Sequence, residues 1–221
     1  MKDPTPKDQP DRFTPYLYPI KEKQKLARTF RKKNIEFLDV LFSRRSNSRF
    51  SKLNLREIAE VLHLCTKVHS ISADKSGFIT TKRTAPSAGA RHPVDLLVSL
   101  PEDTIDKRIL SYYNSIDHSL SELLIKEHHL REFLNDINEN IIIKDTVIIW
   151  FSIQTKKTSS KYTNPASLYW KDTGALLYCI QLISTYLGYK SCPLGKLASD
   201  SFKKLFGTQN LVSGGGILIG K

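Results

Sequence analysis

The sequence has little cysteine and no long apolar run. Its three cysteines are an odd number without a C-x-x-C pair, which argues against both a disulfide framework and a zinc site. The longest apolar runs, at residues 146–153 and 214–220, fall well short of the roughly 20 residues that a membrane-spanning helix needs. The N-terminus carries no apolar signal core. We therefore expect a cytoplasmic protein with no metal and no membrane partner.

Acidic side chains are also scarce. The chain holds 22 Asp and Glu residues against 34 Lys and Arg, a formal net charge of +12. Such a surface favours acidic partners, namely a nucleic acid, an acidic peptide or an acidic protein, although it also serves solubility alone. No recognisable nucleic-acid-binding module accompanies the charge, so we expect no nucleic acid partner. The 221 residues are enough for one domain with a sizeable core.

Proline is concentrated at the start of the chain, where five of the ten prolines fall within residues 1–19. This composition predicts an extended or disordered arm over residues 1–20, followed by one domain over residues 21–221. From residue 21 onwards, apolar side chains recur at three- and four-residue steps, which predicts a helix over about 21–42. Asn54 to Glu57 has the pattern of a capping box, which predicts the start of another helix.

The rest of the chain alternates between strand and helix patterns. Short apolar runs predict strands at 94–100, 111–114, 146–153 and 214–220, with 146–153 as a buried central strand. Helical periodicity predicts amphipathic helices at 119–134 and 172–188, and residues 155–165 read as a polar loop. Ser199 is expected to cap a short last helix and Gly207 to end it.

The most informative stretch, residues 83–93, reads R-T-A-P-S-A-G-A-R-H-P. Its prolines fix φ and lack N–H donors, while Gly89 permits backbone conformations closed to other residues. Small side chains on either side leave room for a flat group against the main chain. By composition alone, an ordinary turn before a strand fits the stretch equally well.

A second informative stretch is basic. Residues 44–50 read R-R-S-N-S-R-F at the end of the first predicted helix. Guanidinium and hydroxyl groups in this arrangement could hold a phosphate through bidentate contacts. The other interpretation is a solvated helix C-terminus, where cations interact favourably with the helix dipole.

These stretches resemble those of nitroreductase-fold flavoenzymes, and most of all the SagB-type azoline dehydrogenases. The loop of that branch runs R-x-x-P-S-[AG]-G-A-x-x-P before a strand. Residues 44–50 resemble its R-R-S-x-R-x-F segment, with Arg49 displaced by one position, and residues 187–195 match L-G-x-x-S-C-P-[IVL]-G. The resemblance implies an α+β fold with a central, mainly antiparallel sheet flanked by helices, and FMN at a homodimer interface.

The resemblance also implies which residues form the site. Those expected on FMN are Arg44, Arg45, Ser46, Pro86, Ser87, Ala88, Gly89, Cys192, Pro193, Leu194 and Gly195. In the family, backbone N–H groups near the last segment point at the flavin N5 and O4, where they stabilise negative charge during hydride uptake. Lys161 and Tyr162 match the catalytic K-Y pair, although a flexible lysine-rich loop is the alternative. The arginines that follow K-Y in the family are missing, because Asn164 and Ser167 stand about where they would be.

The function implied is that of an FMN-dependent oxidoreductase, most specifically a dehydrogenase that oxidises thiazoline or oxazoline rings of a modified peptide to thiazole or oxazole. A cyclodehydratase would then be a partner enzyme. Two other functions stay open: an NAD(P)H-dependent reductase of nitro compounds or quinones, which are small-molecule substrates, and a non-catalytic basic scaffold for an acidic peptide or protein. Arg91 and His92 replace the usual L-Y of the loop. We expect them near the flavin or the substrate channel, unless both point to solvent.

Overall fold

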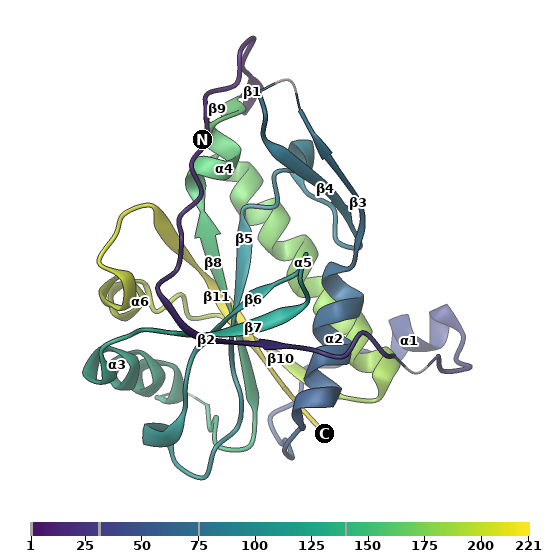
Figure 1. Cartoon of the computed structure of the whole chain (residues 1–221). Helices are drawn as coiled ribbons and strands as arrows, with labels where there is room; N and C mark the ends of the chain where they lie inside the picture. The colour runs from purple at the N-terminus through teal and green to yellow at the C-terminus, as the bar shows by residue number, and fades with distance from the viewer. Residues whose placement is uncertain (1, 31, 75, 140) are drawn as a thin grey trace.

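A sheet of antiparallel strands runs through the middle of the protein (Figure 1). The computed structural model describes residues 2–30, 32–74, 76–139 and 141–221. Within these ranges, seven strands pair in one sheet, each antiparallel to its neighbours. Their order across the sheet is β10 (Lys190–Leu194), β11 (Leu211–Gly220), β8 (Val147–Gln154), β5 (Val94–Ser99), β6 (Ser111–Asn114), β7 (Ser119–Leu123) and β2 (Ile20–Lys25). The predicted mainly antiparallel sheet is therefore confirmed.

Helices cover both faces of the sheet. On one face lie α2 (Leu55–Thr66) and the long α5 (Ala166–Leu187); on the other lie α3 (Glu127–Asn138) and α6 (Ser199–Phe206). The central strand β8 serves both cores, because successive side chains of a strand point to opposite faces. Its Ile149 and Phe151 pack with α2 and α5, while Ile148 and Trp150 pack with α3 and α6.

The predicted helix start at Asn54 is confirmed. The Asn54 side chain accepts a hydrogen bond from the Glu57 N–H (3.0 Å), and the Glu57 carboxylate accepts one from the Asn54 N–H (2.9 Å). This reciprocal pair satisfies two donors that a helix start leaves without partners. From this start, Ile58, Val61 and Cys65 project into the core as the sequence pattern predicts.

Two small antiparallel pairs lie outside the main sheet. The hairpin β3 (Val68–Ala73) and β4 (Ile79–Arg83) stands beside α5, in a region for which the sequence predicts no strands. The N-terminal arm is extended over its own chain, and its strand β1 (Thr5–Pro6) pairs with β9 (Tyr162–Thr163). The remaining short helices are α1 (Phe37–Ser43), η1 (Ala88–Ala90), η2 (Ile105–Lys107) and α4 (Thr155–Ser159).

Two predicted helices are wrong over part of their length. Residues 21–25, expected in a helix, lie in the edge strand β2, and helix α1 covers only residues 37–42 of the predicted 21–42 region. Residues 119–123, also expected in a helix, form β7, because Asn114 closes a turn that returns the chain beside β6. The Asn114 side chain accepts from the N–H groups of Ile116 (3.0 Å) and Asp117 (3.2 Å), as in an Asx turn. In both segments, backbone pairing with a neighbouring strand, rather than side-chain periodicity, determines the secondary structure.

The expected cap of the last helix is also wrong in part. Ala198 occupies the N-cap position in a left-handed conformation, and Ser199 is the first residue of α6. Gly207 ends the helix with φ at 59°, as predicted. The polar loop expected at 155–165 contains α4 and β9, which bring Lys161 and Tyr162 beside the N-terminal arm.

Candidate active site

The loop between β4 and β5 (residues 83–93, hereafter the central loop) is held in an uncommon backbone conformation. Gly89, Ala90 and His92 have φ values of 58°, 55° and 42°. The left-handed region is costly for residues with a Cβ atom, so surrounding contacts must hold Ala90 and His92 in place. The central loop is consequently a built feature and not the ordinary turn that its composition also allowed.

Asp172, on α5, holds the first part of the central loop through two hydrogen bonds. Its carboxylate accepts hydrogen bonds from the Ser87 hydroxyl (2.6 Å) and from the Ala88 N–H (3.1 Å). The Ser87 oxygen in turn accepts from the His92 N–H (2.8 Å). Burial raises the pKa of Asp172, while these two hydrogen bonds act in the opposite direction. The contacts fix Ser87 and Ala88 against α5, so a helix far along the chain sets the geometry of the loop.

Arg91 and His92 fasten the back of the central loop to the β3–β4 hairpin. The buried Arg91 pairs with Asp74 (Nη2 to Oδ2, 2.7 Å), and its guanidinium lies 3.9 Å above the Phe78 ring centroid. The His92 ring lies with Nε2 2.8 Å from the Thr81 carbonyl oxygen, so this nitrogen carries the proton and donates. Burial, followed by the charge of Arg83, lowers the pKa of His92 to about 4. Neither side chain points to solvent.

Lys161 and Tyr162 lie against the front of the central loop at Gly89. A Cβ atom at this glycine would stand 2.7 Å from Tyr162 Oη and 3.0 Å from Lys161 Nζ. Both polar groups therefore converge on the one position of the loop that has no side chain. The N-terminal arm holds their backbone, since the Lys7 N–H donates to the Lys161 carbonyl (2.8 Å) and Pro6 is in register with Tyr162.

The basic segment (residues 44–46, hereafter the arginine cluster) follows α1 and runs beside the edge strand β10. Ser46 forms a parallel bridge with Ser191, and the Asn47 N–H donates to the Ser191 carbonyl (3.0 Å). The guanidinium of the exposed Arg45 donates only to the carbonyls of Phe42 (2.7 Å) and Arg44 (2.9 Å) among the described residues. Its remaining donors are available to an anion.

The strand beside the arginine cluster contains most of the third predicted segment. Cys192, Pro193 and Leu194 lie in β10, and Gly195 follows it with nothing within 4 Å of its Cβ position. Because β10 is the edge of the main sheet, its outer row of backbone groups meets no further strand of that sheet, and the bridge from Ser46 to Ser191 uses part of this row. The Ser191 hydroxyl is buried without a hydrogen-bond partner in the described part of the chain. The Ser191 hydroxyl and the outer backbone groups of β10 that remain unpaired among the described residues could therefore bind a ligand.

The predicted site residues thus gather in two groups at opposite ends of α5. The central loop, Lys161 and Tyr162 lie at the N-terminal end, whereas the arginine cluster and β10 lie at the C-terminal end (Figure 1). From Asp172 to Leu187, α5 rises about 22 Å at 1.5 Å per residue. One chain therefore presents two separate half-sites.

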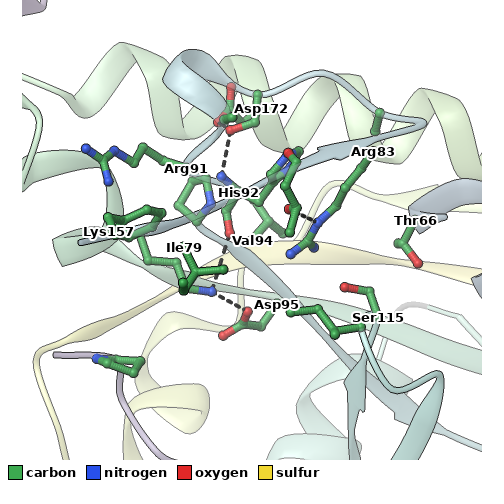
Figure 2. A pocket seen from close by; sticks show the side chains of 18 of the residues that line it. Thr66, Ile79, Arg83, Arg91, His92, Val94, Asp95, Ser115, Lys157 and Asp172 are labelled. Carbon is green, nitrogen blue, oxygen red and sulfur yellow. Dashed lines mark hydrogen bonds and ion pairs between the residues drawn. The ribbon is translucent and has the colours of Figure 1, made fainter. Parts of the chain in front are cut away.

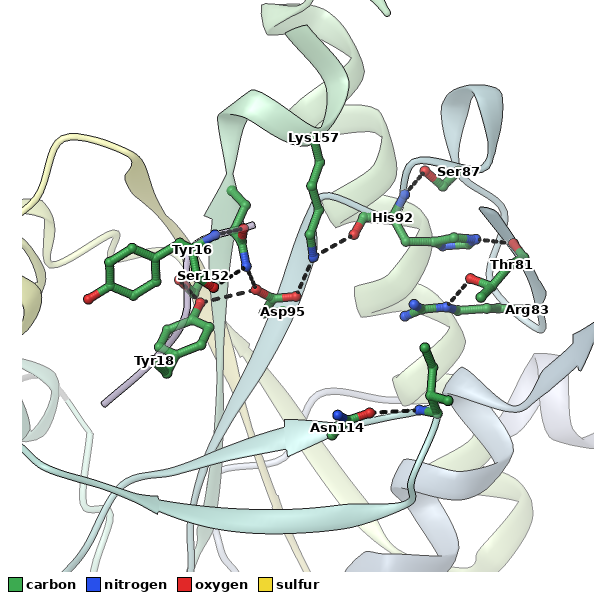
Figure 3. Close-up of polar contacts among 12 residues, drawn as sticks. Tyr16, Tyr18, Thr81, Arg83, Ser87, His92, Asp95, Asn114, Ser152 and Lys157 are labelled. Carbon is green, nitrogen blue, oxygen red and sulfur yellow. Dashed lines mark hydrogen bonds and ion pairs between the residues drawn. The ribbon is translucent and has the colours of Figure 1, made fainter. Parts of the chain in front are cut away.

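A cavity of about 780 Å³ opens behind the central loop, between the β3–β4 hairpin and the sheet (Figure 2). On one of its walls, Lys157 Nζ forms an ion pair with Asp95 (2.7 Å). The second oxygen of Asp95 accepts from Tyr18 Oη (3.1 Å) and Gln154 Nε2 (2.6 Å), as Figure 3 shows in part. The described residues hold no group of three or more His, Cys, Asp or Glu side chains placed for a metal ion. They also include no helix both long and apolar enough to cross a membrane.

A sequence model described as the nitroreductase family matches residues 41–221, a range that includes both half-sites. The chain belongs to the nitroreductase family. A Methanocaldococcus jannaschii protein named as a nitroreductase is 24% identical over 174 residues, which are 77% of this chain and 84% of that protein.

Solved structures show the same fold at low sequence identity. A structure named as a nitroreductase from Ralstonia eutropha has a TM-score of 0.68 at 16% identity and covers 96% of this chain and 97% of that one. A chain of the E. coli microcin synthetase McbBCD complex, with truncated pro-MccB17 bound, has a TM-score of 0.63 at 16% identity (87% and 75% covered). A nitroreductase from Desulfovibrio desulfuricans in complex with FMN scores 0.53 at 13% identity (85% and 87% covered).

The structure adds site residues for which the sequence holds little signal. Asp172 and Asp74 are acidic residues without a motif, yet each anchors one side of the central loop. The N-terminal arm is polar and proline-rich, yet it pairs with the strand that carries Tyr162. Only the tertiary contacts reveal these roles, because each pair is far apart in the chain.

Proposed function

We propose that this nitroreductase-family protein is an FMN-dependent oxidoreductase that oxidises thiazoline or oxazoline rings in a modified peptide. The observation that carries the proposal is the convergence of Lys161 Nζ and Tyr162 Oη on Gly89. A lysine amine and a tyrosine hydroxyl beside a left-handed glycine form a compact proton-transfer group on an otherwise small-residue surface. The fold likeness to a chain of the microcin synthetase complex supports testing a peptide substrate.

The two half-sites fit FMN if two copies of the chain complete the pocket. In a two-fold symmetric dimer, the same surface of both copies meets itself. Antiparallel contact of the two α5 helices then places the arginine cluster of one copy near the central loop of the other. The exposed apolar side chains favour this surface, because Phe37 and Phe42 on α1 and Trp170 and Tyr178 on α5 are all accessible to solvent in one chain.

Each half-site offers a different part of the FMN environment. Arg44, Arg45 and Ser46 would hold the phosphate with charge-assisted hydrogen bonds. The small side chains of the central loop and the backbone edge of β10 would border the flat ring. The free donors of Arg45 and the unpartnered Ser191 hydroxyl agree with this assignment. FMN, when bound, supplies the hydride acceptor and passes the electrons on to oxygen.

The protein's own residues handle the proton. Conversion of an azoline to an azole removes the acidic α-proton and a hydride from the neighbouring carbon. The deprotonated form of Tyr162 Oη or Lys161 Nζ would take the proton, and the two atoms lie close enough to Gly89 to act at one substrate position. The N-terminal arm and Asp172 keep the pair and the central loop in register with each other.

The second candidate is an NAD(P)H-dependent reductase, favoured by the similarity to the archaeal protein named as a nitroreductase. Two assays on the purified protein separate the candidates. Flavin absorbance and mass spectrometry measure bound FMN, and mass spectrometry of a synthetic thiazoline peptide measures the loss of two hydrogens. Peptide oxidation without a nicotinamide supports the proposal. Bound FMN with NAD(P)H-driven quinone reduction and no peptide oxidation would favour the reductase, and absence of FMN binding would favour a non-catalytic scaffold.

A further inference from the structure

The cavity behind the central loop shares that loop with one half-site but contains none of the arginine cluster or β10 residues. Its walls come from the hairpin, from β5 and β6, and from the inner side of the loop, while residues 12–15 of the N-terminal arm close it from outside. Gly89, Lys161 and Tyr162 are not among its lining residues. A molecule in this cavity would contact the central loop at residues other than Gly89, where the Lys161–Tyr162 pair lies.

Positive charge dominates the cavity wall. Four cationic side chains, Arg12, Arg83, Arg91 and Lys157, line it against the two carboxylates of Asp95 and Asp172. Both carboxylates already have partners, since Asp95 pairs with Lys157 and Asp172 accepts from the central loop. Arg91 is neutralised by Asp74. The neutral imidazole of His92, whose pKa is lowered to about 4, adds no charge near neutral pH.

Arg83 is left without a counter-ion. Its Nε donates to Thr81 Oγ1 (2.8 Å), but no ion pair reaches its two terminal nitrogens from the described residues. Figure 3 shows this guanidinium directed into the space between His92 and Asn114. Burial lowers the pKa of Arg83, which reflects the cost of holding a desolvated charge. A guanidinium fork of this kind matches the two oxygens of a carboxylate.

A second donor and apolar walls surround Arg83. Tyr112 lines the cavity, and its hydroxyl makes no hydrogen bond within the part of the chain that the structure describes. Burial raises the pKa of Tyr112, so the hydroxyl keeps its proton and can donate. Phe13 and Phe78, whose ring centroids lie 5.4 Å apart, together with Val94 and Leu176, provide apolar surface for a flat body.

We propose that this cavity binds a small organic anion, a carboxylate on a flat apolar body, with its oxygens on the Arg83 guanidinium and the Tyr112 hydroxyl. The site shares the central loop with the proposed cofactor site but does not include Gly89, Lys161 or Tyr162, and its occupancy does not require FMN. Because Pro86, Ser87 and Ala90 line the same cavity, an occupant would also contact the back of the central loop.

The probe for this site is 4-fluorobenzoate, followed by fluorine NMR with the purified full-length protein and its measured flavin content. The neutral isostere 4-fluorobenzamide tests the requirement for charge. Arg83→Gln should weaken binding of the benzoate by about tenfold or more, since it removes the charged fork. The control Arg131→Gln, an exposed arginine paired with Asp106 and Glu127 on the surface, should leave binding unchanged.

Several results would overturn the proposal. These are absence of benzoate binding at millimolar concentration, equal binding of the benzamide, equal binding by Arg83→Gln, and an equal loss in Arg131→Gln. Displacement of the probe by added FMN would show that the cavity belongs to the cofactor site. If Arg83→Gln does not fold, Tyr112→Phe serves as the test variant. Because it removes one hydrogen bond, we expect a severalfold loss of benzoate affinity. Unchanged benzoate binding in Tyr112→Phe would then refute the assignment. Flavin absorbance reports FMN binding separately, so failure of one proposal is distinguishable from failure of the other.

Discussion

The two half-sites of this protein are built in contrasting ways. The central loop is braced from both sides, by Asp172 on α5 and by Asp74 and Thr81 on the hairpin. The arginine cluster lies along the outer edge of β10, and its exposed Arg45 guanidinium donates, among the described residues, only to the nearby carbonyls of Phe42 and Arg44. A braced loop suits the precise placement of reacting groups, whereas long cationic side chains suit the capture of a phosphate. Under the proposed function, the central loop would position the reacting groups and the arginine cluster would anchor the phosphate.

The strongest test of the braced half-site is the removal of Lys161 and Tyr162, the proposed proton-transfer groups. Tyr162→Phe and Lys161→Ala should each keep FMN bound and slow substrate oxidation by about 10²-fold or more, the usual scale of general acid–base catalysis. Single-turnover assays with a thiazoline peptide measure the rate, and flavin absorbance measures the bound cofactor. Wild-type rates in both variants would place the base elsewhere in the protein.

The anchoring half-site should affect binding instead. Arg45→Ala removes a charge-assisted phosphate contact worth about 1.5–3 kcal/mol, or roughly 10- to 150-fold in FMN affinity. Fluorescence titration of the apoprotein measures this change, with Arg131→Ala as a control on an exposed arginine of α3. An Arg45→Ala protein that holds FMN as tightly as the wild type would remove Arg45 from the site.

Mixing variants tests whether the two half-sites come from different chains. A dimer of one Arg44→Ala/Arg45→Ala chain and one Tyr162→Phe chain would contain one doubly impaired pocket and one intact pocket. Random mixing should then restore about one quarter of the wild-type turnover, since half of the dimers are mixed and each carries one intact pocket of two. Activity is measured after unfolding and refolding the two proteins together, with each refolded alone as the control. If the mixture is no more active than the parents, each pocket is made by a single chain.

The smallest expected effect comes from the buried His92 behind the braced loop. Its folded pKa of about 4 lies below the usual value of 6.5, so between these pH values only the unfolded chain takes up this proton. The stability that His92 contributes is present above pH 6.5 and is lost as the pH falls towards 4. His92 faces Arg83 and Lys157, whose charges add to the effect of burial.

Urea unfolding at several pH values measures this linkage. The wild type should lose about 1–3 kcal/mol more stability than His92→Gln between pH 7 and 4.5. Glutamine keeps a neutral donor that can reach the Thr81 carbonyl but cannot titrate, and both proteins share the same carboxylates. Parallel pH profiles for the two proteins would contradict the low pKa of His92.

The sequence carried enough information for the core and for the motifs. The uninterrupted apolar run at 146–153 predicts the central strand β8, and the capping box at Asn54 predicts the start of α2, because each signal is local. Residues 21–25 and 119–123 were misassigned to helices because β2 and β7 pair with each other across about 95 residues of chain, which no local pattern records. The hairpin around Asp74 gave no usable pattern, since its side chains are mostly exposed.

What the sequence alone determined is a set of short segments with the right chemistry: a small-residue loop, a pair of arginines and a Lys-Tyr pair. What only the tertiary structure decided is their grouping. It placed Lys161 and Tyr162 on Gly89, tied the central loop to Asp172, and separated the arginine cluster from them by most of α5. The physical reason is that a sequence pattern reports on residues a few positions apart. These contacts instead depend on helix and sheet packing that brings together residues many tens of positions apart in the chain.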